Sequence, residues 1–431
     1  MKKLIIAVIF SVLFFGQPLI SFAGPSATFF RGLLGNPENI QRMVENSVIP
    51  EVQAGKTNLL DLLIEGLEAA DDVSFFLPCL RKVHAVVTWK IVHREDAGIF
   101  TPRQNRLSAL FGKPARKENP KPIDFPRDGG RHLSKLIEWW YFNGHLFGDG
   151  GKEFGYELCF FRFGPVISFA HFAITDVTNN KFLYQRTIFS PFACRFSDSE
   201  MKFSYGDWKV SSHGPDFFSV KAQANGIAVN LLLKSAKKPL LVNQTGYLQM
   251  ANEGYSYYYS LVRNETSGAI KFGDQSMKVT GETWVDHQWG NFFLSTIYGW
   301  EWFSLKLKND TQYNIFCFHD AFDNLVNPLA TILYPDNSQE TVKKVGIMPL
   351  GYWTSPHSGR KYPSGYSVLL PEKNSSFVVK PKVVDQELPA NPLSPDFIDY
   401  WEGTCNVEGK VDGKPVSGLA YNEICGYPKN R

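Results

Sequence analysis

The sequence predicts a mainly β protein in which two antiparallel barrels follow a short helical N-terminal extension. After residue 131 the chain is a succession of runs rich in β-branched and aromatic residues, such as 154–163, 227–233 and 255–262, separated by turns rich in Gly, Asn and Asp. Helical periodicity is nearly absent there, so no helices are available to connect parallel strands. We therefore expect two up-and-down barrels of about 150 residues each.

The first 23 residues have the three regions of a signal peptide. Two lysines precede an apolar run from Leu4 to Phe15, and Ser21-Phe22-Ala23 provides the small residues of a cleavage site. Cleavage after Ala23 would give a periplasmic or secreted protein, whereas an uncleaved membrane anchor is the alternative. Beyond this segment no stretch is long and apolar enough for a span, so no integral membrane span is expected after signal cleavage.

Residues 24–110 are predicted to form the helical extension. The segment 59–68 has apolar residues at helical spacing behind a Thr57 or Asn58 cap. Its amphipathic stretch either packs on the protein itself or lies on a membrane surface. Residues 111–130 contain four prolines and several charges, which is typical of an extended linker.

The barrels are expected at 131–292 and 293–431, and a short internal repeat supports this division. Glu138-Trp139 recurs as Glu301-Trp302, and an aromatic strand follows each copy at a similar distance, at 155–160 and 312–318. A barrel of about eight strands leaves an interior for side chains or for one small ligand.

Charge and cysteine content exclude several classes of protein. A net charge of +3 with interspersed charges gives no electrostatic case for nucleic acid. The six cysteines include no Cys-x-x-Cys pair, and no His, Cys or acid spacing matches a metal site, so we predict no metal. No glycine-rich nucleotide loop follows a strand, so we predict no cofactor.

Cys405 and Cys425 lie on two apparent strands joined by a turn at 412–415, which predicts a disulfide between them.

Two clusters of Trp, acids and imidazoles, at 138–146 and 284–290, carry the strongest functional signal. Such clusters are typical of an apolar chamber that holds a few ionisable groups, and a hydrophobic small molecule is the expected occupant. Asp286 is the first candidate for a catalytic residue because it lies between two Trp residues and beside His287. Glu138 is the second candidate, and His287 can orient or deprotonate a water molecule.

Further side chains of these motifs and of neighbouring strands are expected to contact the ligand, namely Trp139, Trp140, Tyr141, His145, Arg162, His171, Tyr257, Trp284, Trp289, Trp300 and Trp302. Strand alternation places Asp286 and His287 on opposite faces. Either face of these strands can line the cavity. Structural roles compete with these assignments: the Trp residues can plug barrel ends or join the barrels, and Glu138 can be paired with Arg162.

The residues that carry these motifs resemble those of a known family. The strings at 126–128, 138–146, 160–162, 281–290, 300–303, 400–403 and 421–427, in this order, resemble the AttH-like and carotenoid 1,2-hydratase lipocalin-like family over about residue 120 to the C-terminus. The resemblance implies a tandem of two lipocalin-like barrels. It also implies relatives that add water to isolated double bonds of terpenoid or phenolic substrates, and exported relatives that are labelled as secreted hydrolases.

Hydration of an isolated alkene needs a strong acid, a surface that tolerates a carbocation and a positioned water. A carboxyl in an apolar cavity has a raised pKa and stays protonated, while Trp and Tyr faces stabilise a cation. The principal hypothesis is that the protein binds an isoprenoid or lipid-like molecule and hydrates or isomerises it through Asp286. A non-catalytic carrier is the alternative. A secreted hydrolase is less favoured because neither Gly-x-Ser-x-Gly nor His-Glu-x-x-His occurs.

Overall fold

The structure is a computed structural model that describes residues 119–163, 167–250, 254–292, 299–319, 325–389 and 399–427. The predicted signal peptide at 1–23 and helical extension at 24–110 lie outside these residues. No helix in the described part of the chain has the length and apolar character needed to cross a membrane. The described residues are mainly β, as the sequence predicts, and form two barrel-like sheets.

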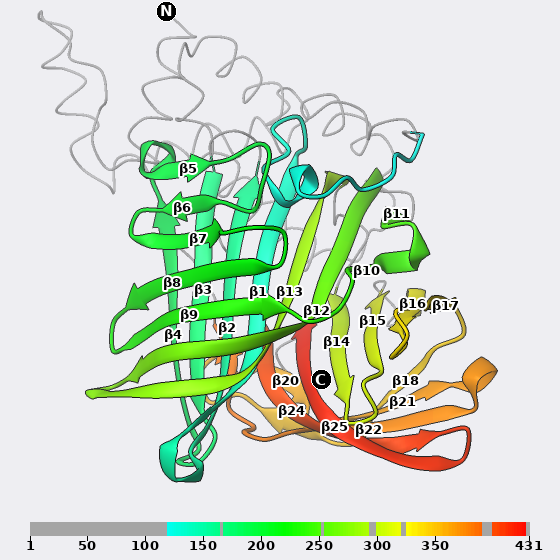
Figure 1. Ribbon diagram of the computed structural model, residues 1–431. Coiled ribbons are helices and arrows are strands. Elements are labelled where there is room, and N and C mark those ends of the chain that lie inside the picture. Colours follow the sequence, from blue (N-terminus) through cyan, green and yellow to red (C-terminus); the bar gives the residue numbers. More distant parts are fainter. Residues whose placement is uncertain are drawn as a thin grey trace, which may run out of the picture. The chain divides into compact units, whose positions relative to one another are not determined.

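The first sheet is an antiparallel meander of the strands β1 to β13. They are β1 (Ile137–Gly148), β2 (Glu153–Phe163), β3 (Ile167–Asp176), β4 (Lys181–Phe189), β5 (Cys194–Phe196), β6 (Phe203–Tyr205), β7 (Trp208–Ser212), β8 (Phe217–Ala224), β9 (Ile227–Ser235), β10 (Leu240–Leu241), β11 (Tyr247–Gln249), β12 (Gly254–Phe272) and β13 (Gln275–Phe292). The sheet closes on one side because its last strand, β13, pairs with β1, as Figure 1 shows.

The second sheet repeats this plan from β14 to β25. Its strands are β14 (Gly299–Leu307), β15 (Gln312–His319), β16 (Leu325–Leu333), β17 (Gln339–Val342), β18 (Gly346–Pro349), β21 (Tyr366–Leu370), β22 (Ser375–Pro381), β23 (Glu387–Leu388), β24 (Tyr400–Val411) and β25 (Lys414–Cys425), while β19 (Tyr352–Thr354) and β20 (Lys361–Pro363) form a separate pair. Here β25 pairs with β14. Short 3-10 turns lie at Arg127–Gly129, Asp149–Gly151, Pro191–Ala193, Val242–Gln244 and Pro371–Lys373.

Both sheets therefore have the same connectivity, in which consecutive strands pair and the last strand returns to the first. In the described residues β4 and β5 do not pair, and neither do β17 and β18. The strand pairing of each sheet is therefore interrupted after its fourth strand. Glu138 and Glu301 occupy corresponding places near the starts of β1 and β14, and both face the interior of their own barrel. The short sequence repeat thus corresponds to a repeated architecture.

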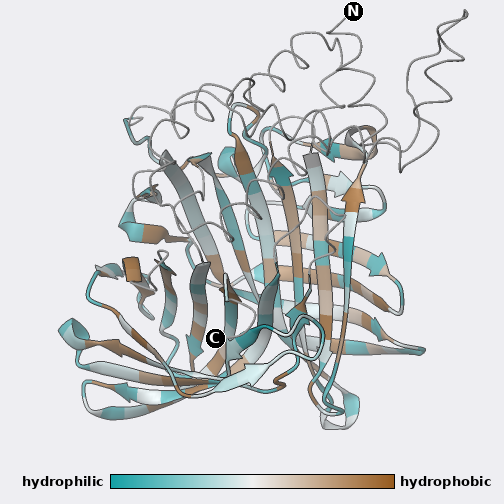
Figure 2. Cartoon of the chain, turned by 180° about the vertical axis from the view of Figure 1, so that it is seen from behind, coloured by the Kyte–Doolittle hydropathy of each residue, from teal (hydrophilic) through white to brown (hydrophobic). Residues whose placement is uncertain are grey.

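Alternation along the strands divides the side chains between the barrel interiors and the outer faces. Hydrophobic and hydrophilic residues follow one another along the strands of both sheets (Figure 2). Trp140, Val285 and Trp289 belong to the core of the first barrel, whereas Tyr141 and Trp284 belong to a cluster shared with the second barrel. Two successive residues on one strand therefore lie in different environments, because successive side chains point to opposite faces of a strand.

The end of the predicted linker packs on the first barrel rather than extending into solvent. Residues 119–127 are mostly exposed, but Asp128, Gly129 and Gly130 are buried. Trp140 Nε1 donates to the carbonyl of Gly129 at 3.1 Å, and Lys135 Nζ donates to Tyr255 Oη at 2.8 Å. This segment therefore covers one end of the barrel interior.

The predicted disulfide between Cys405 and Cys425 is wrong. Both are free thiols, although they do lie on the two strands of one hairpin. Asp412 and Gly413 form its two-residue turn, so Cys405 lies opposite Ala420, and Cys425 lies opposite Tyr400. Cys425 is five residues beyond the partner of Cys405 and faces the other side of the sheet, which puts the two thiols out of bonding range.

Candidate active site between the barrels

The two barrels pack against each other through the outer faces of their central strands. In the first barrel these strands are β1, β2, β12 and β13, and in the second barrel β14, β15, β24 and β25. The shared cluster includes Tyr141 and Trp284 from the first barrel and Trp302, Phe316 and Tyr421 from the second. The interface is therefore rich in aromatic rings, and ionisable groups inside it are largely shielded from water.

Asp286 projects from β13 into this interface, where three donors hold its carboxylate. Tyr258 Oη donates to Oδ2 at 2.6 Å, and Oδ1 accepts from Ser260 Oγ and, at 2.6 Å, from Trp284 Nε1. Ser260 lies directly opposite Asp286 on β12, and Trp284 precedes it by two residues on the same face. Burial raises the pKa of Asp286 to about 7, although the three hydrogen bonds act in the opposite direction.

Tyr258 connects Asp286 to the second barrel. Its hydroxyl accepts hydrogen bonds from Trp302 Nε1 at 2.8 Å and from Asn314 Nδ2 at 2.9 Å. Asn314 Nδ2 also donates to Ser260 Oγ at 3.1 Å. Because donors from both barrels converge on the groups that hold Asp286, the packing of the barrels fixes the geometry of this site.

A group of glutamates lies in the same interface. Glu402 and Glu423 are directly opposite each other on β24 and β25. Tyr141 donates from the first barrel to Glu402, and Trp300 Nε1 donates to Glu423 Oε1 at 2.7 Å. Tyr141 is also the cross-strand neighbour of Asp286. The aspartate and the glutamates therefore belong to one continuous site.

The interface raises the pKa of these glutamates. Burial raises the pKa of Glu423 to about 7. Burial, followed by the charge of Glu423, also raises the pKa of Glu402 and that of Glu157 well above the ordinary value. Carboxyl groups this close together hold a shared proton more readily than two full charges. The site can therefore keep a carboxylic acid protonated near neutral pH.

Polar atoms without a protein partner lie next to this glutamate group. Both carboxyl oxygens of Glu157, on β2, are buried and make no hydrogen bond within the described residues. The same holds for both amide atoms of Asn143, directly opposite on β1, and for Ser304 Oγ on β14. Buried polar atoms of this kind are normally satisfied by water or by a bound molecule. This part of the interface therefore offers polar contacts to a ligand.

A separate network surrounds Glu138 inside the first barrel. His132 Nδ1 lies 2.8 Å and His287 Nε2 lies 3.1 Å from Glu138 Oε1, while Arg162 Nε donates to Oε2 at 2.9 Å. Asp128 Oδ1 lies 3.1 Å from the other ring nitrogen of His132. Burial alone would raise the pKa of Glu138, but the hydrogen bonds with the two imidazoles outweigh it and lower the pKa to about 2. Glu138 is thus ionised near neutral pH and is a poor proton donor.

This network matches the structural alternative for Glu138, namely an ion pair with Arg162. Burial lowers the pKa of His287 to about 4, so its ring is neutral near pH 7. Ligand atoms of His132, Glu138 and His287 lie within 4.8 Å of one another, a set that can hold a metal ion. The carboxylate, however, already accepts hydrogen bonds from Arg162 and from the backbone of His132. Hydrogen bonding accounts for the arrangement, and the absence of a metal stays a prediction.

The structure divides the sequence-predicted site residues into two sets. The interface between the barrels contains Asp286, Trp139, Tyr141, His145, His171, Trp284, Trp300 and Trp302. The interior and end of the first barrel contain Glu138, Trp140, Arg162, Tyr257, His287 and Trp289. Asp286 and His287 therefore do not meet, as alternation requires.

Sequence reasoning gave no role to several residues of the interface, namely Asn143, Glu157, Tyr258, Ser260, Lys306, Asn314, Glu402 and Glu423. Glu402 and Glu423 do lie in two of the strings that carry the family resemblance, Glu402 beside Trp401 and Glu423 two residues after Tyr421. An acid close to an aromatic residue was thus a signal in the sequence that could have marked both glutamates as site candidates. Their meeting across one hairpin depends on the strand register, which that signal does not contain.

Comparison with known proteins places the described sheets in a family. The family model described as AttH-like matches residues 116–427. The crystal structure of a putative AttH from Nitrosomonas europaea has a TM-score of 0.66 and 26% identity, and the match covers 73% of this chain and 100% of that one. No match to a curated protein sequence was found.

Two further solved structures share the fold at lower identity. Kievitone hydratase from Nectria haematococca has a TM-score of 0.59 and 17% identity, and the match covers 72% of this chain and 98% of that one. The structure of CghA with Sch210972 has a TM-score of 0.50 and 12% identity, with coverage of 69% and 90%. At these identities the similarity shows a shared fold and nothing more.

Proposed function

The chain belongs to the AttH-like family, and from this premise we propose that it holds a hydrophobic, isoprenoid or lipid-like molecule between its two barrels and hydrates or isomerises it by acid catalysis. The observation that carries the proposal is the burial of several carboxyl groups among aromatic rings at this interface. The buried Asp286 and the partly buried Glu423 each have a pKa of about 7. Such groups supply a proton near neutral pH, where an exposed carboxyl is ionised.

Asp286 and Glu423 are the two candidate proton donors. Asp286 is enclosed by three hydrogen-bond donors, whereas Glu423 is only partly buried and receives one hydrogen bond from Trp300. Protonation of an alkene carbon creates a cation, which the faces of Trp300 and Trp302 can stabilise without attacking it. Glu157, whose oxygens have no hydrogen-bond partner within the described residues, can orient the water that adds to the cation. The carboxylate left by the proton donor then takes the proton that the added water releases, which restores the acid.

The comparisons support hydration among the possible acid-catalysed reactions. One structure with the same fold is named a hydratase. At 17% identity this similarity supports a shared fold. The proposed reaction of this chain is therefore argued from its own carboxyl groups described above. No metal or redox cofactor enters the proposed step.

A carrier without catalysis is the second candidate, and one observation favours it. Both oxygens of Asp286 already accept hydrogen bonds from the protein itself, which is the arrangement of a structural carboxylate. In that case the same aromatic interface would bind the hydrophobic molecule and release it unchanged.

Turnover in isotopically labelled water tests the proposal. The purified protein is incubated with a panel of isoprenoid and phenolic alkenes in water containing ¹⁸O, and products are analysed by mass spectrometry. A product heavier by one labelled water, lost in Asp286→Asn or Glu423→Gln and retained in the exposed controls Asp274→Asn and Glu265→Gln, supports hydration. A product whose mass is unchanged but whose double bond has moved supports isomerisation. Binding without any product contradicts catalysis and favours the carrier.

We also propose that the protein is exported after cleavage behind Ala23. The charged, apolar and small-residue regions of 1–23 support this proposal. N-terminal sequencing of the protein from its own host should begin at Gly24. A sequence that begins at Met1, in a soluble cell fraction, would contradict export.

A further inference from the structure

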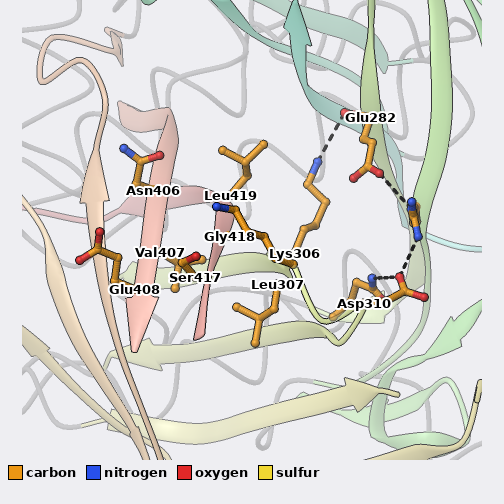
Figure 3. Close-up of a pocket in the computed structure, with 13 residues that line it drawn as sticks. Glu282, Lys306, Leu307, Asp310, Asn406, Val407, Glu408, Ser417, Gly418 and Leu419 are labelled. Carbon is orange, nitrogen blue, oxygen red and sulfur yellow. Dashed lines mark hydrogen bonds and ion pairs between the residues drawn. The ribbon is translucent and has the colours of Figure 1, made fainter. Parts of the chain in front are cut away.

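A pocket of about 560 Å³ opens where β12 and β13 of the first barrel meet β14, β24 and β25 of the second (Figure 3). Arg263 and Glu282 line it from the first barrel, and Lys306, Lys308 and Glu408 line it from the second. It lies at the opposite end of β14 from Trp300 and the glutamate group. The pocket is thus an opening at the edge of the interface that holds the candidate active site.

Lys306 is the unusual residue of this pocket. It is only 6% exposed, and its side chain lies on the same face of β14 as Trp302 and Ser304. Within the described residues its ammonium group makes one hydrogen bond, of 3.4 Å from Nζ to the backbone carbonyl of Glu282, drawn as a dashed line in Figure 3. Within the described residues no carboxylate lies in ion-pair range of this ammonium group.

The acids around Lys306 are already neutralised by other cations. Arg263 forms ion pairs of 2.9 Å with both Glu282 and Asp310, and Lys237 Nζ lies 3.6 Å from Asp310. The remaining charged groups on the pocket wall, Lys308 and Glu408, are exposed to solvent. The charge of Glu282 raises the pKa of Lys306 and that of Arg263 lowers it, both less than burial does. The charge of Lys306 in turn lowers the pKa of His145, which burial lowers first.

A buried ammonium group without a counter-ion is costly unless an anion binds beside it. Burial lowers the pKa of Lys306 to about 8, so the group is still largely protonated at pH 7. This leaves one positive charge available at the wall of an open pocket.

We propose that Lys306 binds the carboxylate of an amphipathic ligand whose apolar part lies along β14 toward Trp302. The inference rests on the proposed function and specifies its substrate class as a hydrophobic carboxylic acid. Lys306 and Trp302 are four residues apart, which corresponds to about 13 Å along the strand. Between them stands Ser304, a small side chain whose buried hydroxyl has no hydrogen-bond partner within the described residues. A ligand of this length brings its double bond to the Asp286 and Tyr258 end of the site.

Binding of a fluorescent polyene fatty acid, cis-parinaric acid, and of its methyl ester tests this proposal in the full-length protein. Wild type should bind the acid at least about tenfold more tightly than the ester, because only the acid forms a charge-assisted hydrogen bond with Lys306. Lys306→Met should remove this preference by weakening the acid alone. Lys306→Arg should keep the preference, and Lys278→Met, at an exposed lysine of β13 outside the pocket wall, should leave it unchanged.

The pH dependence gives a second readout. The preference for the acid should fall as the pH rises through about 8, where Lys306 loses its proton. Equal affinity for acid and ester in wild type, or equal weakening by Lys306→Met and Lys278→Met, would overturn the role of Lys306 and leave the proposed function standing. Failure of both probes to bind would contradict the ligand site itself. Thermal melting of each variant shows that the fold is retained.

Discussion

Asp286 and His287 illustrate how strongly one residue's place on a strand decides its chemistry. Asp286 faces the aromatic interface between the barrels, where burial raises its pKa to about 7. His287 faces the interior of the first barrel, where its Nε2 lies 3.1 Å from Glu138. Two adjacent side chains of one motif therefore belong to different networks. The motif therefore does not provide a paired acid and base.

Asp286→Asn should change how the stability of the protein depends on pH. Because the folded-state pKa of Asp286 lies above its unfolded value, the folded protein holds a proton that the unfolded chain has released between about pH 4 and 7. Stability due to this group is present at the acidic end of that window and is lost toward pH 7, by roughly 2–4 kcal/mol. The variant should therefore show a flatter dependence in denaturant titrations.

The control for this prediction is Asp274→Asn, in the exposed turn between β12 and β13. It should keep the wild-type dependence. An Asp286→Asn curve parallel to that of wild type from pH 4 to pH 7 would show that Asp286 is ionised across the window and is not a proton donor.

Arg162→Met should destabilise the first barrel because it leaves the Glu138 charge buried without its cation. Glu138 is fully buried and Arg162 is 2% exposed. Removing one partner of such a pair costs about 3–5 kcal/mol. Arg131→Met, which removes a solvent-exposed partner of Asp198, should cost less than about 1 kcal/mol in the same urea denaturation series. Equal effects of the two variants would argue against a structural role for the Glu138 network.

At the scale of single elements, the β24–β25 hairpin shows what a two-residue turn determines. Once Asp412 and Gly413 form the turn, every cross-strand pair in the hairpin follows. The register puts Glu402 opposite Glu423, which creates the carboxyl pair of the candidate site, and it separates Cys405 from Cys425. The same register therefore explains both the wrong disulfide and the glutamate pair that sequence reasoning missed.

The two thiols should remain free in the protein isolated from its own host. Alkylation under denaturing, non-reducing conditions, followed by peptide mapping, should label both Cys405 and Cys425. The physical reason is that they lie in different cores, Cys405 inside the second barrel and Cys425 in a cluster at its outer face. A cross-linked peptide that joins them would contradict the hairpin register.

Strands β2 and β24 approach closely at Gly155, where the barrels meet. A Cβ atom at this position would lie 2.8 Å from the Cβ and Cγ2 atoms of Thr404. Gly155→Ala should therefore push the barrels apart and lower the free energy of unfolding by about 1–3 kcal/mol. It should also weaken binding of a hydrophobic probe.

Gly346→Ala is the matched control, because a Cβ there would meet Leu369 at an ordinary 3.5 Å. Both variants are to be compared by thermal denaturation and probe binding. If Gly155→Ala were as stable as Gly346→Ala, the close packing of the two barrels at this point would not be a constraint on the site.

At the scale of the whole molecule, much of the fold follows from periodicity. Alternating and aromatic runs after residue 131 predict antiparallel strands, and the recurrence of Glu138-Trp139 as Glu301-Trp302 predicts two similar units. The structure confirms both, since each sheet is a meander whose last strand returns to the first. Such patterns are local, which is why a single sequence contains them.

The site is less predictable because it lies between the units. Asp286, Trp284 and Trp302 were expected from their motifs: Trp284 donates directly to Asp286, and Trp302 is linked to it through Tyr258. Alternation could not say which face lines a cavity, because both faces of β1 and β13 are buried, one in the barrel and the other against the second barrel. Glu157 lies outside the motifs, and Asn143 has no assigned role within its own, so only the packing of the two barrels gives them a role.

Native mass spectrometry of the protein from its own host, with organic extraction of whatever is bound, is the most direct test of the central claim. We expect a hydrophobic molecule bound to the chain, with a double bond or a hydroxyl group at the position of a former double bond. A protein that carries no such molecule and takes up no lipid or terpenoid probe would contradict the account and would indicate a structural or partner-binding role.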